Sequence, residues 1–240
     1  MNQGGSSGGR AEIHHKHRDV NGGWLRPAVF GAMDGLVSNF ALIAGVAGGT
    51  ASVKVVSLAG VAGLAAGAFS MAGGEYVSVA SQRELALAEI DIERAELANN
   101  AQAEELELAR QFEGRGVESG LAAEVARQIS RDPVQALEVH TREELGLDPG
   151  DLPAPRLAAI SSFLSFSVGA IIPLVPYLVG ATLLWFSAAV SMLALFVAGA
   201  IVSRVTARSW WFSGFRQLAV GALAGALTFG LGSLLGAGGL

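Results

Sequence analysis

Hydrophobic residues lie in five long runs along the chain. The runs cover residues 28–49, 55–80, 157–178, 181–203 and 217–238. A membrane-spanning helix needs roughly 20 mostly apolar residues, because each residue adds about 1.5 Å and the hydrocarbon layer is about 30 Å thick. Each run is long enough, and residues 157–203 carry no charged side chain at all. The pattern therefore predicts an all-α polytopic membrane protein with five transmembrane helices.

One polar block, residues 81–155, separates the second run from the third and holds 17 of the 21 acidic residues. Residues 84–112 are rich in Ala, Leu and Glu, which predicts one long helix. A second helix is expected over 117–130. A third is expected over 132–146, where an Asp-Pro pair suits the first turn and Gly146 suits the stop. The expected regions are an amino-terminal tail (1–27), transmembrane helices one and two (28–80), a three-helix acidic insert (81–155) and transmembrane helices three to five (156–240).

The basic residues indicate how the chain lies across the membrane. With five spans, the tail, the insert and the loop at 204–216 share one side, and that side holds all of the 16 Lys and Arg residues except Lys54. Basic residues are concentrated on the cytoplasmic side of membrane proteins. We therefore expect the amino terminus and the insert to be cytoplasmic and the carboxyl end to lie outside. In a prokaryote this arrangement places the protein in the cell membrane.

Composition excludes several other classes of protein. The chain has no cysteine, so disulfides, thiolate catalysis and iron–sulfur clusters are not expected. The first residues are polar throughout and do not fit a cleavable signal peptide. The basic residues are scattered and the large polar block is acidic, so no nucleic-acid binding is expected.

Two carboxylates, Asp34 and Glu75, fall inside the predicted spans. A charge at mid-membrane costs at least about 2.5 kcal/mol, so such residues usually mark an ion path; alternatively, each lies near a span end and reaches the interface. Met71 lies one helical turn from Glu75, so both are expected to face the same space. A carboxylate beside a thioether suits Fe²⁺ better than Mg²⁺ or Ca²⁺. Asn39 adds either another oxygen ligand or a polar contact between helices.

The insert carries a second group of candidate metal ligands. If residues 84–112 form one helix, five glutamates share an arc of about 80° on its surface. These are Glu89, Glu93, Glu96, Glu104 and Glu107. A solvated acidic face is the ordinary alternative, but such a face usually includes Lys or Arg one turn away. On the third helix, His140 and Glu144 are four residues apart and would complete a cluster of ligands for a divalent metal ion.

The amino-terminal tail contains His14, His15 and His17, which indicate either a metal-binding tract or an incidental polar flank. One rival function is a membrane-anchored ferroxidase or iron store, whose ligands are typically Glu-x-x-His pairs. The insert contains no such pair, although Glu12 and His15 in the tail have the spacing. A second rival is a scaffolding insert whose acids only interact with water.

Four stretches of the chain resemble the vacuolar iron transporter family. They are DGLVSNFALIAGVAGG in the first span, GAFSMAGGEYVSVASQRE in the second, REELGLDP at the end of the insert and SFLSFSVGAIIPLVPYL in the third span. The resemblance extends over nearly the whole chain after about residue 17. It implies a homodimeric transporter, not an enzyme, that moves Fe²⁺, often also Mn²⁺, out of the cytosol in exchange for protons. The transported ion is the only bound metal it implies, without a further cofactor.

The same resemblance implies roles for individual residues. Asp34 and Met71 are expected to line the translocation path, while Glu75 either binds metal or stabilises the helix bundle. In the insert the implied metal ligands are Glu93, Glu96, Glu104 and Glu107. On the third insert helix the family has a methionine and carboxylates, whereas this chain has His140, Thr141 and Glu144. The ligand set there is therefore expected to differ from the family pattern.

Overall fold

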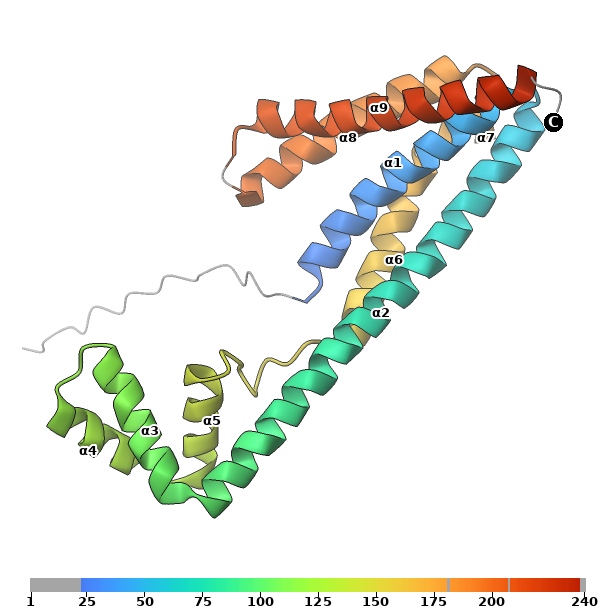
Figure 1. The fold of residues 1–240 in the computed structure, drawn as a ribbon. Coiled ribbons are helices and arrows are strands. Elements are labelled where there is room, and N and C mark those ends of the chain that lie inside the picture. The colour runs from blue at the N-terminus through green and yellow to red at the C-terminus, as the bar shows by residue number, and fades with distance from the viewer. Residues whose placement is uncertain (1–22, 181, 207, 238–240) are drawn as a thin grey trace, which may run out of the picture.

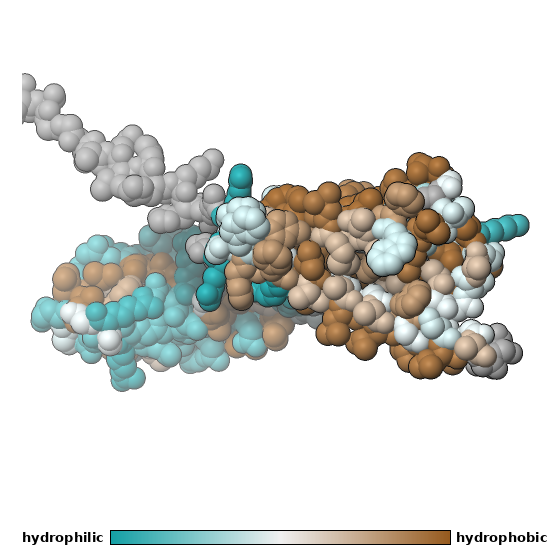
Figure 2. All heavy atoms as spheres, turned by 90° about the horizontal axis from the view of Figure 1, so that it is seen from above, coloured by the Kyte–Doolittle hydropathy of each residue, from teal (hydrophilic) through white to brown (hydrophobic). Residues whose placement is uncertain are grey.

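The computed structural model describes residues 23–180, 182–206 and 208–237, and within them every regular element is a helix. The membrane part contains α1 (Leu25–Gly49), the first half of α2 (Val53–Asn99), α6 (Pro155–Ile171), α7 (Val175–Leu178), α8 (Leu184–Thr206) and α9 (Trp210–Ala237). The insert contains the end of α2 together with α3 (Ala101–Gly114), α4 (Ser119–Ile129) and α5 (Pro133–Glu143). Hydrophilic residues gather on the insert and hydrophobic residues cover the remaining helices (Figure 2). The prediction of an all-α membrane protein is confirmed.

Four of the described helices are long and apolar enough to cross a membrane: α1, α2, α8 and α9. The apolar helix α6 is shorter, with 17 residues. Helix α1 contacts α2 and α6 on one side and α8 and α9 on the other (Figure 1). It is therefore the central helix of the membrane part, and residues on it can face cavities on both sides.

Glycines let α1 approach its neighbours closely. A Cβ added at Gly35 would lie 2.3 Å from the carbonyl oxygen of Phe166 on α6, and one at Gly232 on α9 would lie 1.8 Å from the carbonyl oxygen of Gly45. Neither position has room for a side chain. Because lipid is as apolar as the helix surfaces, such close backbone contacts supply much of the attraction between helices in a membrane.

Helix α2 continues out of the membrane without interruption. It has 47 residues, which corresponds to about 70 Å, and it runs from the membrane part into the insert (Figure 1). The predicted boundary at residue 81 is therefore not a helix boundary. The reason lies in the sequence, since residues 75–99 contain neither Gly nor Pro. The insert is thus held by a continuous helix rather than by a flexible linker on this side.

The prediction of one helix over 84–112 is wrong, because the helix is interrupted at Asn100. Asn100 has φ −128° and ψ 31°, which lies outside helical geometry, and it separates α2 from α3. Its side-chain amide donates a hydrogen bond to Glu96 Oε2 at 2.6 Å. Asn is a weak helix former because its side chain competes for nearby hydrogen bonds. The two asparagines at 99 and 100 were the sequence signal for this break.

The run at 157–178 is also divided, into α6 and α7. Pro173 has no N–H group to continue the α6 ladder, and the N–H of Leu174 bonds to the carbonyl of Ile171 at 3.0 Å. The carbonyl of Ala170 therefore loses the partner it would have in a regular helix. This break lies within the membrane part and is important for the site described below.

The insert packs around a small apolar core. Leu108 and Ala109 of α3 meet Ala126 of α4, and Val139 of α5 packs against them. The expected start of the third insert helix is confirmed, because Asp132 accepts a hydrogen bond from the N–H of Val134 at 2.9 Å. Its expected stop is confirmed in part: the helix ends at Glu143, and Gly146 adopts a φ of +64° just beyond it.

Candidate metal-binding sites

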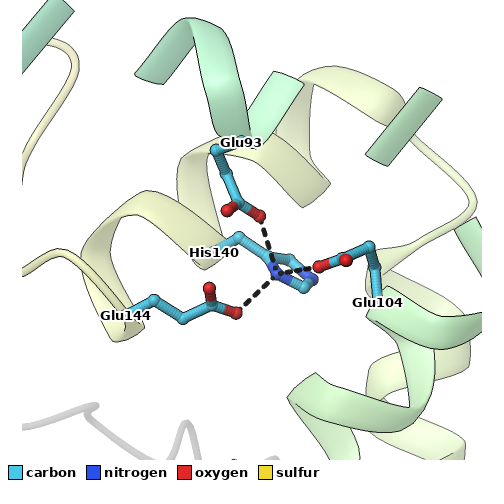
Figure 3. A group of neighbouring side chains, drawn as sticks. All are labelled: Glu93, Glu104, His140 and Glu144. Carbon is cyan, nitrogen blue, oxygen red and sulfur yellow. Dashed lines mark hydrogen bonds and ion pairs between the residues drawn. The ribbon is translucent and has the colours of Figure 1, made fainter. Parts of the chain in front are cut away.

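Four side chains of the insert converge around His140 (Figure 3). The imidazole is 0% exposed, and its Nδ1 lies 2.9 Å from Glu144 Oε1, 3.1 Å from Glu93 Oε1 and 3.7 Å from Glu104 Oε2. One donor atom from each of the four residues lies within 4.8 Å of all the others. Three carboxylate oxygens and one imidazole nitrogen at this separation form a donor set that suits a divalent transition-metal ion. We call these four residues the insert cluster.

Three helices bring the insert cluster together. Glu93 comes from the last turns of α2, Glu104 from the first turn of α3, and both His140 and Glu144 from the end of α5. The break at Asn100 reverses the chain, so Glu104 returns towards Glu93 instead of lying further along one axis (Figure 1). The prediction that these glutamates share one face of a single helix is therefore wrong, although Glu93 and Glu104 do meet.

An ion pair joins α5 to the end of α3. Arg115, at the end of α3, pairs with Glu143. Next to it, Thr141 is buried and its hydroxyl donates a hydrogen bond to the carbonyl of Leu137 at 2.8 Å. Glu143 is therefore engaged by an arginine, whereas the adjacent Glu144 turns towards His140. Sequence reasoning did not anticipate the Arg115 pair, because the spacing between its partners shows no local pattern.

The carboxylates of the insert cluster are electrostatically crowded. Burial is the main cause that raises the pKa of Glu93, and the charge of Glu144 raises it further, while His140 acts in the opposite direction. Burial likewise raises the pKa of Glu104, followed by the charge of Glu107. Among the described residues, no group forms a hydrogen bond with His140 Nε2. A bound cation would relieve the repulsion between these carboxylates.

The other predicted glutamates lie outside the insert cluster. Glu96 and Glu107 are exposed and Glu89 is partly exposed. Glu96 accepts the hydrogen bond from Asn100, and Glu107 is close enough for its charge to affect the pKa of Glu104. Their expected role as metal ligands stays a prediction.

In the membrane part, Asp34 and Met71 line one cavity of about 280 Å³ between α1 and α2. Ser38, Asn39 and Ser70 also line it. We call this the Asp34–Met71 cavity. Met71 also packs against the small apolar cluster of Ala68, Phe166 and Ala170, which holds its side chain at the wall. An aspartate, a methionine and residues with neutral polar side chains thus line one space.

Glu75 lies elsewhere. Together with Asp34 it lines a second cavity of about 570 Å³, whose wall includes Arg26 and Arg216. The expectation that Met71 and Glu75 face the same space is therefore wrong. Positions four apart on a helix differ by about 40° and by one turn in height, which is enough to separate two neighbouring cavities. Asp34 lines both cavities, so it stands between them.

The histidines of the tail, His14, His15 and His17, and the pair Glu12 and His15 lie outside the described residues.

Comparison with known proteins bears on what these sites belong to. A family model described as the VIT family matches residues 25–233, which include the insert cluster and the Asp34–Met71 cavity. The chain belongs to the VIT family. This membership confirms the resemblance found in the sequence motifs.

Several VIT-family relatives match along most of their length. A protein of Acanthamoeba castellanii named vacuolar iron transporter is 39% identical over 227 residues, which cover 91% of this chain and 82% of the relative. Proteins named vacuolar iron transporter 1 are 31% identical in Oryza sativa and 30% identical in Arabidopsis thaliana, with 89% and 90% of those chains covered. Shared architecture therefore extends over the membrane helices and the insert together.

Proposed function

We propose that this VIT-family chain carries Fe²⁺, and also Mn²⁺, out of the cytosol across the membrane in exchange for protons. Relatives named vacuolar iron transporter support iron as the cargo. The single observation that carries the proposal is the Asp34–Met71 cavity, which places a carboxylate and a thioether among helices of membrane-spanning length. This donor pair suits a borderline divalent ion.

In this proposal α6 and α7 together form the third of five spans. The amino terminus, the insert and the α8–α9 connection lie in the cytoplasm, which is supported by the basic residues on that side. Two copies form a homodimer in the membrane, the cell membrane if the source is prokaryotic. The insert then stands in the cytosol, where it meets the ion first.

The insert cluster serves as the cytosolic collection site. Carboxylates bind a metal ion only in their deprotonated form, so binding releases protons. The raised pKa values of Glu93 and Glu104 mean that the metal-free cluster holds protons more tightly than ordinary glutamates do. Metal and protons therefore compete for the same oxygens, and the occupancy of the cluster depends on pH.

The ion then moves to Asp34, whose carboxylate is shared by the cavity on the Met71 side and the cavity on the Glu75 side. A single carboxylate neutralises half of the charge of a divalent ion. Protons that arrive from the outer face compete for this carboxylate and release the metal, which links metal movement to proton movement.

Uptake into sealed vesicles under anaerobic conditions tests the proposal. The purified full chain in proteoliposomes should deliver Fe²⁺ to a chelating fluorophore trapped inside, at a rate that increases with an opposing proton gradient. Binding without delivery to the lumen would contradict transport and support an iron store. Iron accumulation that requires oxygen would support a ferroxidase.

A further inference from the structure

The break between α6 and α7 leaves one backbone carbonyl in need of a partner. Pro173 cannot donate, and the N–H of Leu174 bonds to Ile171, so the carbonyl of Ala170 has no partner in its own helix. The side-chain amide of Asn39 on α1 supplies one: its Nδ2 donates to Ala170 at 2.6 Å. This bond assigns the two ends of the amide, because a carbonyl oxygen accepts only from the NH₂ group.

The other end of the amide remains unsatisfied. Asn39 is 2% exposed, and among the described residues none donates a hydrogen bond to its Oδ1. A buried polar atom without a partner costs about 1–3 kcal/mol, so such atoms usually have a purpose or a ligand. Oδ1 faces α2 at Gly63, where an added Cβ would lie 2.8 Å from it. The side chain of Leu42 lies at the same place, with its Cδ2 2.3 Å from that Cβ position, so only a glycine at 63 leaves room for both side chains.

Asn39, Leu42 and Gly63 all line the Asp34–Met71 cavity. We propose that the amide oxygen of Asn39 is a third protein ligand for the transported cation, beside Asp34 and Met71. The inference rests on the proposed transport function and adds a residue that governs which metal is preferred. Asn39 is thereby a helix cap through Nδ2 and a metal ligand through Oδ1.

The bond to Ala170 makes this ligand rigid. With Nδ2 held by a backbone carbonyl, the side chain presents Oδ1 in one orientation before the ion arrives, which lowers the entropic cost of binding. The amide adds a hard oxygen donor without adding charge. Hard oxygen donors favour Mn²⁺ more than the thioether does, whereas the softer sulfur of Met71 favours later and softer metals. Asn39 should therefore matter more for Mn²⁺ than for Fe²⁺.

The test compares two substitutions at the same break in the helix. Asn39→Leu keeps the branched shape and the number of side-chain heavy atoms and removes the amide. Ser187→Ala removes another side-chain hydrogen bond to this break, in which the buried Ser187 hydroxyl donates to the carbonyl of Pro173 at 2.6 Å. Ser187 lies outside the wall of the Asp34–Met71 cavity. Initial rates of Mn²⁺ and Fe²⁺ uptake by the full chain in proteoliposomes are measured against metal concentration.

With Asn39→Leu we expect the KM for Mn²⁺ to rise by at least about tenfold, the lower end of the effect of residues that orient metal ligands. The KM for Fe²⁺ should rise less, and Ser187→Ala should leave the ratio of the two KM values unchanged. If Asn39→Leu does not fold, Asn39→Asp keeps an oxygen at the site and loses the donor to Ala170. It should retain a low KM for both metals.

Three results would overturn the inference. One is that the wild type transports both metals and Asn39→Leu leaves the ratio of the KM for Mn²⁺ to the KM for Fe²⁺ unchanged. Another is an equal loss of rate in Asn39→Leu and Ser187→Ala, which would make Asn39 a helix cap alone. The third is a folded Asn39→Asp protein whose KM for Mn²⁺ rises by at least about tenfold, as expected for Asn39→Leu. If the wild type transports neither metal, the proposed function fails and this inference fails with it.

Discussion

The insert and the membrane helices both carry carboxylates at candidate metal sites, but Glu93 and Glu104 of the insert are buried whereas Asp34 of α1 is partly exposed. In the insert, three glutamates lie around one histidine within 4.8 Å, and the adjacent Glu143 pairs with Arg115. In the membrane part, Asp34 shares its cavity with Met71 and neutral polar groups. A site with several negative charges retains a divalent cation, whereas a site with a single negative charge leaves it partly uncompensated and able to depart. The comparison supports a holding role for the insert and a passing role for the membrane cavity.

The two regions also differ in how they are packed. Backbone contacts at glycines join α1 to α6 and α9, while the insert depends on the small core around Leu108 and on side-chain ion pairs. Substitutions can therefore disturb one region and leave the other intact.

The largest effect is expected from Asp34→Asn. It removes the carboxylate of the Asp34–Met71 cavity and leaves the insert cluster unchanged. Fe²⁺ uptake into proteoliposomes should fall by at least about 100-fold. Loss of a residue that only supports a metal ligand already costs up to about 100-fold, and Asp34 is proposed as a ligand itself. Metal binding by the insert, measured by titration calorimetry on the full chain in detergent, should be unaffected. The exposed Asp91→Asn on α2 is the matched control, and full uptake by Asp34→Asn would contradict the assigned path.

The reverse change is Glu93→Gln, which alters the insert cluster alone. We expect the affinity of the insert for Mn²⁺ to fall by about 10- to 100-fold, because a charged ligand is replaced by a neutral one. Glu84→Gln changes an exposed glutamate on the same helix that is not among the predicted ligands, and it should have a much smaller effect. Titration of the full-length proteins compares them directly. Equal losses in both variants would indicate a diffuse acidic surface instead of a defined site.

A smaller effect, on stability, is expected from Gly232→Ala. A Cβ at this position would meet the backbone of Gly45, so α9 must shift away from α1 at a cost of about 1–3 kcal/mol. Gly230→Ala is the control, because a Cβ there meets nothing within 4 Å. The thermal midpoint in detergent, followed by tryptophan fluorescence, should fall only in the first variant, and metal binding by the insert should stay as it is. Equal midpoints would show that this helix contact is loose.

The smallest effect concerns pH and the metal-free insert. Burial raises the pKa of Glu93 and Glu104 above the ordinary value of 4.5. Groups with a raised pKa contribute stability that is complete below their unfolded pKa and is lost as pH rises through the folded pKa. Glu124 and Asp148 have lowered pKa values, so both are already ionised at pH 5 and contribute little to the change above it.

Hydrogen exchange in the full chain measures the pH-dependent stability of the metal-free insert. Corrected for the intrinsic pH dependence of exchange, protection of the α5 amides should fall as the pH rises above the ordinary glutamate range, and Mn²⁺ should restore it. In Glu93→Gln the fall should be shallower. Protection that rises over this pH range without metal would show that the cluster is not crowded.

Much of the architecture follows from local signals in the sequence. The apolar runs predict the membrane helices, and Asp132 with Gly146 marks the start of α5 and the turn after it, because capping depends on residues close in sequence. Pro173 is an equally local signal, but the apolar run at 157–178 is long enough to predict one uninterrupted helix. Asn100 lies between strong helix formers on both sides, so the composition of residues 84–112 also predicts one helix.

The candidate sites depend on contacts that local patterns do not encode. Glu93, Glu104 and His140 were all expected as ligands, yet their convergence depends on the reversal at Asn100. Met71 and Glu75 line different cavities, and Asp34 of α1 lines both. The bond from Asn39 to Ala170 joins residues 131 positions apart and exists because α6 is broken. The sequence identifies the residues, and tertiary packing determines which of them meet.

The most direct test of the central claim is to record metal and proton movement together in one preparation. Proteoliposomes that contain the full chain and two trapped dyes, one for Fe²⁺ and one for pH, are given Fe²⁺ outside under anaerobic conditions with an acidic lumen. The account predicts that Fe²⁺ enters while the lumen becomes more alkaline, and that both signals disappear in Asp34→Asn. Fe²⁺ entry with no change in lumenal pH, or both signals unchanged in Asp34→Asn, would contradict it.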